Sequence, residues 1–497
     1  MENINNRKTE YVFLFAVFCL ASFLFFSNLG NHYLWQDEAE TALVGKTIME
    51  HGIPLGFDGK NFFSQAEMED LTEKYVWKWH TWFQYYVTAA SFSIFGINNF
   101  SARFPFVLFG IASVILVYFF TLSLFRDRRT AKIATVLLLV SVPFLVASRQ
   151  CRYYAPAAFF TLFSLYCYLN IIENKKYAKT LFVLSSILLF HTAFPYCIIL
   201  LVTVSIHSLL WHREKLASIL IISAAVFLIN LPWLIWTSDI QYSKREGIVR
   251  FVKYASTFIS QTGKYIFSPL LFLVPLIVGA VTWKKSKRFF SEDQNMWRSL
   301  FLLIFYVFGT IGVFFLKSPF PFFRYLVPLI PIFCIITSLI VVSVAKLHIA
   351  LAVGVFVFLI AISPFTDFLY EITHNYDGPV EGIAKYLNAN GSDNHVVAIT
   401  CGDLPLKFYT NMKVIGALSG EDYSAADDAD WLIIRKYSCT RKGYRFATYL
   451  ARLVNLGNYQ KIVIDYPDIA YENREGPRFH KFRTVKNEDR VTIYRKK

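Results

Sequence analysis

The chain has 497 residues, of which 55% are hydrophobic and 18% aromatic, and its formal net charge is +15. A soluble protein cannot bury so large an apolar fraction, so most of the chain must have lipid as its solvent. The positive charge would suggest a nucleic-acid partner in a soluble protein, but here much of it lies in short loops between apolar runs, where it reports membrane topology.

Apolar runs long enough to cross a bilayer, about 20 residues, recur from Tyr11 to Pro364 and then stop. The first run has no small-residue cleavage site, so we interpret it as a retained helix and not as a signal peptide. The apolar segment 83–96 is too short to place by hydropathy alone. If it spanned the membrane, the basic loop 126–132 would face outwards against the positive-inside rule, so we predict that it lies along the membrane surface.

The sequence therefore predicts an α-helical polytopic membrane protein with about eleven transmembrane helices. They are expected at residues 11–28, 104–125, 131–147, 154–172, 178–191, 193–211, 216–236, 265–283, 298–316, 323–344 and 347–364. This arrangement places the N-terminus inside and the C-terminus outside. Three segments then face outwards: the first loop 29–103 with surface helices at 38–51 and 82–96, the short loop 148–154, and 238–264.

We predict two domains, a transmembrane domain at 1–369 and a soluble α/β domain at 370–497. In the second, strand-like and helix-like segments alternate. The strands are expected at 395–400, 431–434 and 461–465, and the helices at 380–388 and 444–454. Two of the seven cysteines, Cys401 and Cys439, fall in this domain. They form one disulfide or remain two unpaired thiols, and sequence spacing does not decide between these.

An acidic pair, Asp37 and Glu38, follows the first predicted span. A carboxylate there is suited to accept a proton from an incoming hydroxyl or amine at a site shielded from bulk water. Acidic residues at a helix start also cap free backbone N–H groups, and for the pair alone capping is the favoured interpretation. The basic residues expected on the same face of the membrane change this preference, so that we favour a proton acceptor over a helix cap.

Several basic residues are expected on the outer face, where the positive-inside rule does not predict them, and charges at membrane depth tend to mark function. They are Arg149, Arg152, Lys244, Arg245, Arg250, Lys253, Lys317 and Arg324. A lipid phosphate bound by bidentate arginines would stabilise such a cluster. Alternatively, individual side chains reach to lipid headgroups or pair with acidic residues of the first loop.

The end of the first loop, 77–82, carries three tryptophans around Lys78 and His80. The tryptophans are typical of membrane-interface anchors. His80 has the chemistry of a second base or a metal ligand, but a lone histidine is more often a hydrogen-bonded structural residue. An acidic run earlier in the loop is expected to be a solvated face: Glu67, Glu69, Asp70 and Glu73.

The order of these motifs resembles the GT-C class of membrane glycosyltransferases. More narrowly, it resembles the branch that contains protein O-mannosyltransferases and bacterial aminoarabinose transferases of lipid A. The segments that carry the resemblance are the acidic pair, the helix at 41–52, the aromatic segment 82–86, and residues 95–96, 102–105, 148–155 and 324–331. They cover the membrane region in order and the soluble tail only faintly.

The resemblance implies a GT-C-like fold and an enzyme that moves a sugar from a polyprenyl-phosphate donor to an acceptor on the outer face of the membrane. Asp37 would be the general base, and Glu38 would orient neighbouring groups. The donor phosphate would be held by Arg149, Arg152, Tyr153, Arg324 and Tyr325. Fixed guanidinium groups stabilise the negative charge that grows on the phosphate as the bond to the sugar breaks. A direct displacement inverts the anomeric configuration.

The sequence departs from the family pattern at two places. The proline pair that many relatives carry before the second surface helix is replaced around His80 and Thr81, which leaves His80 and Lys78 as acceptor-side or supporting residues. Some relatives carry an acidic residue in the second outer loop, where this chain has Arg152 and Tyr153. A divalent metal is therefore less well supported, and no cofactor is assigned.

The acceptor stays open among lipid A, a surface glycan and a protein, and nucleic acid is not an expected partner. The resemblance implies a bacterial inner membrane, with the active site and the C-terminal domain facing the periplasm. Two other classes compete. A lipid-linked glycan flippase or transporter would show repeat symmetry, and no inverted repeat is apparent. A glycan polymerase or ligase would place its key residues in late outer loops.

Overall fold

The computed structural model describes residues 2–237, 294–317, 323–361, 363–375, 377–436, 441–469, 480, 482–483 and 489–497. The chain forms two compact units. Unit 1 comprises Met1–Ser27, Phe106–Arg149 and Tyr153–Phe368, and unit 2 comprises Asn28–Pro105, Gln150–Arg152 and Leu369–Lys497. Some predicted features lie outside the described residues: the span 265–283, the outer segment 238–264 with Lys244, Arg245, Arg250 and Lys253, the side chain of Lys317, and Cys439. The pairing of Cys401 with Cys439 therefore stays open.

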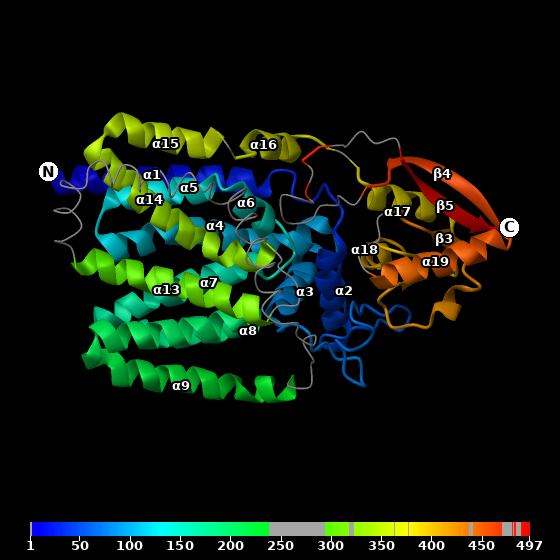
Figure 1. Cartoon of the computed structure of the whole chain (residues 1–497), viewed down its shortest axis with the longest axis horizontal. Helices are drawn as coiled ribbons and strands as arrows, with labels where there is room; N and C mark the ends of the chain where they lie inside the picture. The colour runs from blue at the N-terminus through cyan, green and yellow to red at the C-terminus, as the bar shows by residue number, and fades with distance from the viewer. Residues whose placement is uncertain are drawn as a thin grey trace. The chain divides into compact units, whose positions relative to one another are not determined.

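Unit 1 is a bundle of long apolar helices with nearly parallel axes (Figure 1). Its helices are α1 (Glu2–Phe26), α4 (Asn99–Phe125, from Phe106 on), α5 (Arg128–Leu139), α6 (Val142–Ser148), α7 (Tyr154–Ile172), α8 (Ala178–Trp211), α9 (Arg213–Trp236), α13 (Gln294–Lys317), α14 (Ile330–Leu347) and α15 (Ile349–Ala361), with the 3-10 helix η1 at Phe323–Leu329. Among the described residues, seven helices are long and apolar enough to cross a membrane, or eight if the bent pair α5 and α6 is one span. The polytopic helical class is confirmed, while the number of eleven spans stays a prediction.

The span predicted at 131–147 is not one straight helix. It consists of α5 and α6, which meet at an angle of 61°. Pro143 lies in the first turn of α6, where its missing N–H breaks no helical hydrogen bond. The predicted span 131–147 thus corresponds to a bent pair of helices. A helix continued from α5 through Pro143 would lack the proline N–H and would clash with the carbonyl four residues earlier, which explains the break.

The chain turns back on itself within α8. Ala193 has non-helical angles, φ −163° and ψ 94°, two residues before Pro195. The Sγ atom of Cys197 lies 3.2 Å from the carbonyl oxygen of Ser186, eleven positions earlier. Residues so far apart in a straight helix would be separated by about 16 Å. α8 thus consists of two helices that run in opposite directions and meet near Ala193. This agrees with the two separate spans predicted at 178–191 and 193–211.

The first loop in unit 2 contains two helices close to the predicted positions, α2 (Gln36–His51) and α3 (Phe83–Phe95). Both end at a glycine with positive φ, Gly52 at +75° and Gly96 at +74°, a conformation that other residues adopt only at a cost. With 13 residues, α3 is about 20 Å long. This length agrees with the prediction that it does not span. Its position along the membrane surface stays a prediction.

The C-terminal part of unit 2 is an α/β fold with a five-stranded sheet in the order β2-β1-β3-β5-β4. Its strands are β1 (Val396–Ile399), β2 (Lys413–Gly416), β3 (Trp431–Ile433), β4 (Tyr459–Pro467) and β5 (Arg490–Lys496). β1 is parallel to β2 and β3, and β5 is antiparallel to β3 and β4. The helical segments are α16 (Phe365–Thr373, from Leu369 on), α17 (Pro379–Asn390), α18 (Asp403–Tyr409), α19 (Arg441–Asn455) and the 3-10 helix η2 (Tyr423–Ala426).

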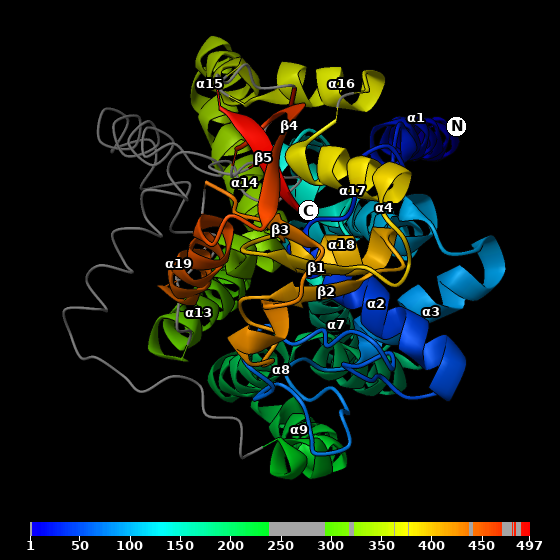
Figure 2. The ribbon, with the colours of Figure 1, turned by 90° about the vertical axis from the view of Figure 1, so that its right-hand side faces the viewer.

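Two apolar clusters cover the two faces of this sheet. α17 and α18 contribute Ile383 and Leu406 to a cluster with Trp431, and α19 contributes Phe446 to the other cluster. Figure 2 shows these three helices packed around the sheet. The three predicted strands and both predicted helices are present, whereas β2, β5 and α18 were not predicted. The residue at which the chain leaves the membrane stays a prediction. The domain boundary near Tyr370, which depends on it, stays a prediction too.

Candidate active site

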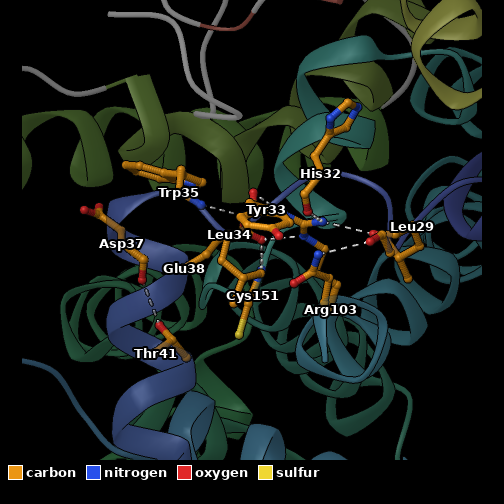
Figure 3. Close-up of polar contacts among 12 residues, drawn as sticks. Leu29, His32, Tyr33, Leu34, Trp35, Asp37, Glu38, Thr41, Arg103 and Cys151 are labelled. Carbon is orange, nitrogen blue, oxygen red and sulfur yellow. Dashed lines mark hydrogen bonds and ion pairs between the residues drawn. The ribbon is translucent and has the colours of Figure 1, made fainter. Parts of the chain in front are cut away.

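The start of α2 directs Asp37 and Glu38 to different sides of the helix. Neighbouring residues of an α-helix are rotated by about 100° around its axis. Figure 3 shows Glu38 pointing toward Arg103 and the Asp37 carboxylate pointing away from it. Asp37 is 9% exposed and Glu38 is 0% exposed. The two acidic residues therefore have separate surroundings and separate chemistry.

Glu38 is a buried anchor. Arg103 on α4 donates to it through Nε at 2.8 Å and Nη2 at 2.7 Å. The backbone N–H groups of Cys151, at 2.8 Å, and of Trp35, at 3.4 Å, donate to the same carboxylate. The contact to Trp35 is that of a helix-capping residue. These four donors fill the lone-pair positions of a carboxylate, so Glu38 has no oxygen left to accept a proton from a substrate.

Arg103 extends this anchor to the chain that leads into α2. Its Nη1 atom donates to the carbonyl oxygens of Leu29, at 3.0 Å, and His32, at 2.8 Å, and its Nη2 atom donates to that of Tyr33, at 3.2 Å. Arg103 is itself 3% exposed. The bidentate pair with Glu38 therefore fixes where Asp37 is presented.

Arg152 lies beside Asp37 on the other side of α2 and is 1% exposed. Its Nη1 atom is within hydrogen-bonding distance of Glu40 Oε1, at 2.9 Å, Thr41 Oγ1, at 3.0 Å, and the carbonyl oxygen of Asp37, at 3.1 Å. Its Nη2 atom is 3.3 Å from His80 Nε2 and 4.0 Å from Asp37 Oδ2. The structure thus brings together three of the predicted residues, Asp37, Arg152 and His80.

Glu40 was not among the predicted site residues, although it is central to this cluster. It is 3% exposed and accepts hydrogen bonds from Arg152, from Gln65 Nε2 at 2.6 Å and from the Tyr85 hydroxyl at 3.2 Å. Burial raises the pKa of Glu40, and the charge of Arg152 opposes this rise. Its three-residue spacing from Asp37, which places both on one helix face, was the signal in the sequence.

One acidic residue predicted to be solvated is buried and supports this cluster. Asp70 is 2% exposed and accepts the Ser64 hydroxyl at 2.6 Å and the Gln65 N–H at 2.9 Å, whereas the other three acids of that run are exposed. These hydrogen bonds replace the ones that the carboxylate would make to water, so Asp70 can be buried. Gln65 in turn donates to Glu40, so the loop around Asp70 holds the far side of the cluster.

Arg149, predicted to hold the donor phosphate, lies in unit 1 at the end of α1. Its Nη1 atom donates to the carbonyl oxygens of Leu24, Phe25 and Ser27 at 3.0, 3.0 and 2.9 Å. Cations are favourable at helix C-termini, where these carbonyls lack helical partners. Arg149 therefore stabilises the end of α1, and its contact with a donor stays a prediction.

Three further predicted donor-binding residues, Tyr153, Arg324 and Tyr325, also belong to unit 1, whereas Arg152 belongs to unit 2. The Arg324 guanidinium is 5.9 Å from the centre of the Tyr325 ring. That ring stacks on Phe314 with centroids 4.6 Å apart, and the Tyr325 carbonyl accepts the Tyr196 hydroxyl at 2.9 Å. Tyr153 is 6% exposed at the start of α7. These contacts fix the backbone of η1 around Arg324, which is itself partly exposed.

Lys78 is half-buried, and its backbone N–H donates to the carbonyl of Asp70 at 3.0 Å. His80 contacts the site through Arg152. Among the residues that the structure describes, no group of three or more histidine, cysteine or acidic side chains is placed to hold a metal ion. Asp37, Glu40 and His80 instead converge on the Arg152 guanidinium, so a divalent metal between them does not fit.

Residues 80–236 match a family model described as dolichyl-phosphate-mannose-protein mannosyltransferase. A curated protein of Aquifex aeolicus, described as uncharacterized, is 25% identical over 156 residues. That match covers 31% of this chain and 28% of the length of the Aquifex protein.

The whole fold resembles solved membrane proteins. For ArnT from Cupriavidus metallidurans in the apo state the TM-score is 0.58 at 14% identity, and 98% of each chain is covered. For ArnT bound to undecaprenyl phosphate it is 0.52 at 13% identity, with the same coverage. For the archaeal oligosaccharyltransferase AglB from Archaeoglobus fulgidus, in complex with an inhibitory peptide and a dolichol-phosphate, it is 0.60 at 13% identity, covering 92% of this chain and 73% of AglB. The chain has the GT-C fold, as the resemblance predicted.

Proposed function

We propose that this chain, which has the GT-C fold of membrane glycosyltransferases, transfers a sugar from a polyprenyl-phosphate donor to an acceptor on the outer face of the membrane. Two of its structural neighbours were solved with undecaprenyl phosphate and with a dolichol-phosphate, which supports this class of donor. Lipid A, a surface glycan or a protein is the acceptor. We place the protein in a bacterial inner membrane, with the site and the C-terminal domain facing the periplasm.

The surroundings of Asp37 carry this proposal. Glu38 and Glu40, its acidic neighbours on α2, are hydrogen-bonded to arginines at 2.7 to 2.9 Å. Asp37 lies on the same turn of α2, is 9% exposed, and its carboxylate is 4.0 Å from the Arg152 guanidinium. A carboxylate held at a fixed position in a site shielded from bulk water is suited to act as a general base.

In the proposed reaction, the acceptor nucleophile gives its proton to Asp37 and attacks the anomeric carbon of the donor sugar. The bond from that carbon to the phosphate oxygen breaks, and the polyprenyl phosphate leaves with the electron pair. Attack opposite to the leaving group inverts the anomeric centre. We assign the donor phosphate to Arg324 and Tyr325 first, because Arg149 and Arg152 already bind carbonyl groups and acidic side chains.

The test is donor turnover by purified protein supplied with labelled polyprenyl-phosphate sugars. Asp37→Asn should lower turnover by about 100-fold or more, the contribution of a general base. Glu69→Gln is the matched control, because Glu69 is an exposed acidic residue of the same loop and should keep wild-type turnover. Equal turnover by wild type and Asp37→Asn would refute the base assignment. A wild-type protein that moves lipid-linked glycan across vesicles without cleaving it would favour a flippase.

The outer location of the site has its own test. In a variant whose seven native cysteines are replaced by serine, a cysteine introduced by Arg128→Cys should resist membrane-impermeant thiol reagents added from outside intact cells, whereas one introduced by Glu69→Cys should react. Labelling of position 128 from outside would reverse the proposed topology.

A further inference from the structure

The guanidinium of Arg152 is enclosed by groups of the kind that bind metal ions. Carboxylate oxygens of Glu40 and Asp37 lie 2.9 and 4.0 Å from it, and the imidazole Nε2 of His80 lies 3.3 Å from it. The Thr41 hydroxyl and the Asp37 carbonyl complete the shell at 3.0 and 3.1 Å. Carboxylate, imidazole and carbonyl groups are also the usual ligands of divalent cations.

The cluster needs a cation because its members are buried. Asp37, Glu40 and Arg152 are 9%, 3% and 1% exposed, and two carboxylates in such surroundings repel each other unless a positive charge lies between them. The Glu38 carboxylate is already neutralised by Arg103. Arg152 is thus the positive charge that lies between Asp37 and Glu40 and reduces their repulsion.

We infer that Arg152 is a built-in cation of the active site, which takes the position of a divalent metal between Asp37 and Glu40 and makes the enzyme metal-independent. The inference rests on the proposed function for its catalytic part. Metal ligands lie about 2.0 to 2.6 Å from their ion, so no ion enters while the guanidinium keeps these groups apart. Arg152 acts here through Asp37, as a positioning residue held in place by Glu40.

Manganese binding, followed by electron paramagnetic resonance of the full-length protein in detergent, tests this without any assay of turnover. The wild type should bind no Mn²⁺ at this site. Arg152→Ala should gain one Mn²⁺ site, because it leaves two carboxylates and an imidazole facing one space, and Arg152→Ala with Glu40→Gln should lose it again. A wild-type Mn²⁺ site that Glu40→Gln removes would overturn the inference, and so would an Arg152→Ala variant that folds but binds no Mn²⁺.

Turnover of the wild type gives a second test that needs no variant. Donor cleavage should be unchanged after treatment with EDTA, and added Mn²⁺ should not raise it. Loss of turnover with EDTA and its return with Mn²⁺ would overturn the inference even if Arg152→Ala fails to fold. If the wild type cleaves no polyprenyl-phosphate sugar at all, the proposed function fails, while the manganese measurement still decides the role of Arg152.

Discussion

The ring of Tyr33 stacks on the ring of Tyr409, with centroids 3.8 Å apart and planes inclined by 23°. The Tyr409 hydroxyl accepts the Leu34 N–H at 2.7 Å and donates to Asn99. The N–H of Tyr33 donates to Glu381 on α17 at 3.0 Å. The C-terminal fold therefore holds the segment that leads into α2 and presents the proposed base.

Tyr409→Phe should lower turnover while the protein stays folded. The substitution keeps the stacked ring but leaves the buried Leu34 N–H without its acceptor, which costs about 1 to 3 kcal/mol. We expect a roughly tenfold fall in kcat, since about 1.4 kcal/mol of lost positioning corresponds to a factor of ten. The measurement is steady-state donor cleavage at saturating donor.

Tyr386→Phe is the matched control for this prediction. Tyr386 lies on α17, packs against the same apolar cluster as Tyr33 and Tyr409, and its ring approaches Trp431 at 6.1 Å. Its turnover should equal that of the wild type. Equal losses in the two variants would mean that the tyrosines act on the stability of the C-terminal fold and not on the start of α2.

Glu38→Gln should destabilise the protein far more than Asp37→Asn does. It leaves the Arg103 guanidinium, 3% exposed, without its ion pair, and breaking a buried pair costs about 3 to 5 kcal/mol. Asp37 is 4.0 Å from Arg152, so its neutralisation removes a weaker interaction. Thermal unfolding in detergent, followed by tryptophan fluorescence, should show a large drop in the transition temperature for Glu38→Gln alone.

A double-mutant cycle checks that this loss comes from the pair. Combining Glu38→Gln with Arg103→Gln should destabilise the protein by less than the sum of the two single changes, because the second substitution removes the uncompensated charge. Additive losses would show that Glu38 and Arg103 stabilise the fold independently of each other.

The positions of the helices could be predicted because an apolar run determines where a spanning helix can lie. The run at 154–172 became α7 with the same bounds. The sharp bend between α5 and α6 was missed because the hydropathy of the run does not change across it. β2 and β5 were missed for another reason: β2 is bounded by Lys413 and Gly416, and β5 carries charged residues at both ends. Their place in the sheet depends on pairing with distant strands.

Several residues of the candidate site could be proposed from the sequence, but the contacts between them could not. Proton acceptor and helix cap were alternatives for the acidic pair, and the capping contact belongs to Glu38 while Asp37 stays the candidate base. Arg103 reaches Glu38 across 65 positions of the chain, and Arg152 reaches Glu40 across 112. No local pattern contains such pairs. For Arg152, pairing with an acidic residue of the first loop was one of the two alternatives, and the structure shows it with Glu40, while its donor-phosphate role stays a prediction.

Asp70 should make stability fall with rising pH over a limited range. Burial raises its pKa above the ordinary value of 3.8, although hydrogen bonds from Ser64 and Gln65 oppose the rise. Above pH 3.8 the unfolded chain loses this proton while the folded protein keeps it, so stability falls until the raised pKa is passed. Asp70→Asn should lack this slope.

Unfolding temperatures measured across that pH range, for Asp70→Asn and the wild type, check this prediction. Glu73→Gln, a change at an exposed acid of the same loop, should keep the wild-type slope. An Asp70→Asn profile parallel to that of the wild type would show that other groups cause the pH dependence.

Gly110→Ala should destabilise unit 1, and Gly312→Ala should not. A Cβ atom at Gly110 on α4 would lie 2.7 Å from Cε1 of Phe25 and 2.9 Å from Cβ of Ser148. Phe25 is fully buried, so the ring on α1 or the backbone of α6 must move, and overpacking of this kind costs about 1 to 3 kcal/mol. The expected result is a lower thermal unfolding temperature.

Gly312 on α13 provides the matched control, because a Cβ atom there would meet nothing within 4 Å. Alanine replaces a helix-interior glycine with a gain of about 0.5 to 1 kcal/mol in helix stability, so Gly312→Ala should unfold at or above the wild-type temperature. Equal shifts for the two variants would show that helix propensity, and not the close approach of α1, α4 and α6, decides the effect. Opposite shifts would show that Gly110 is required where these three helices meet.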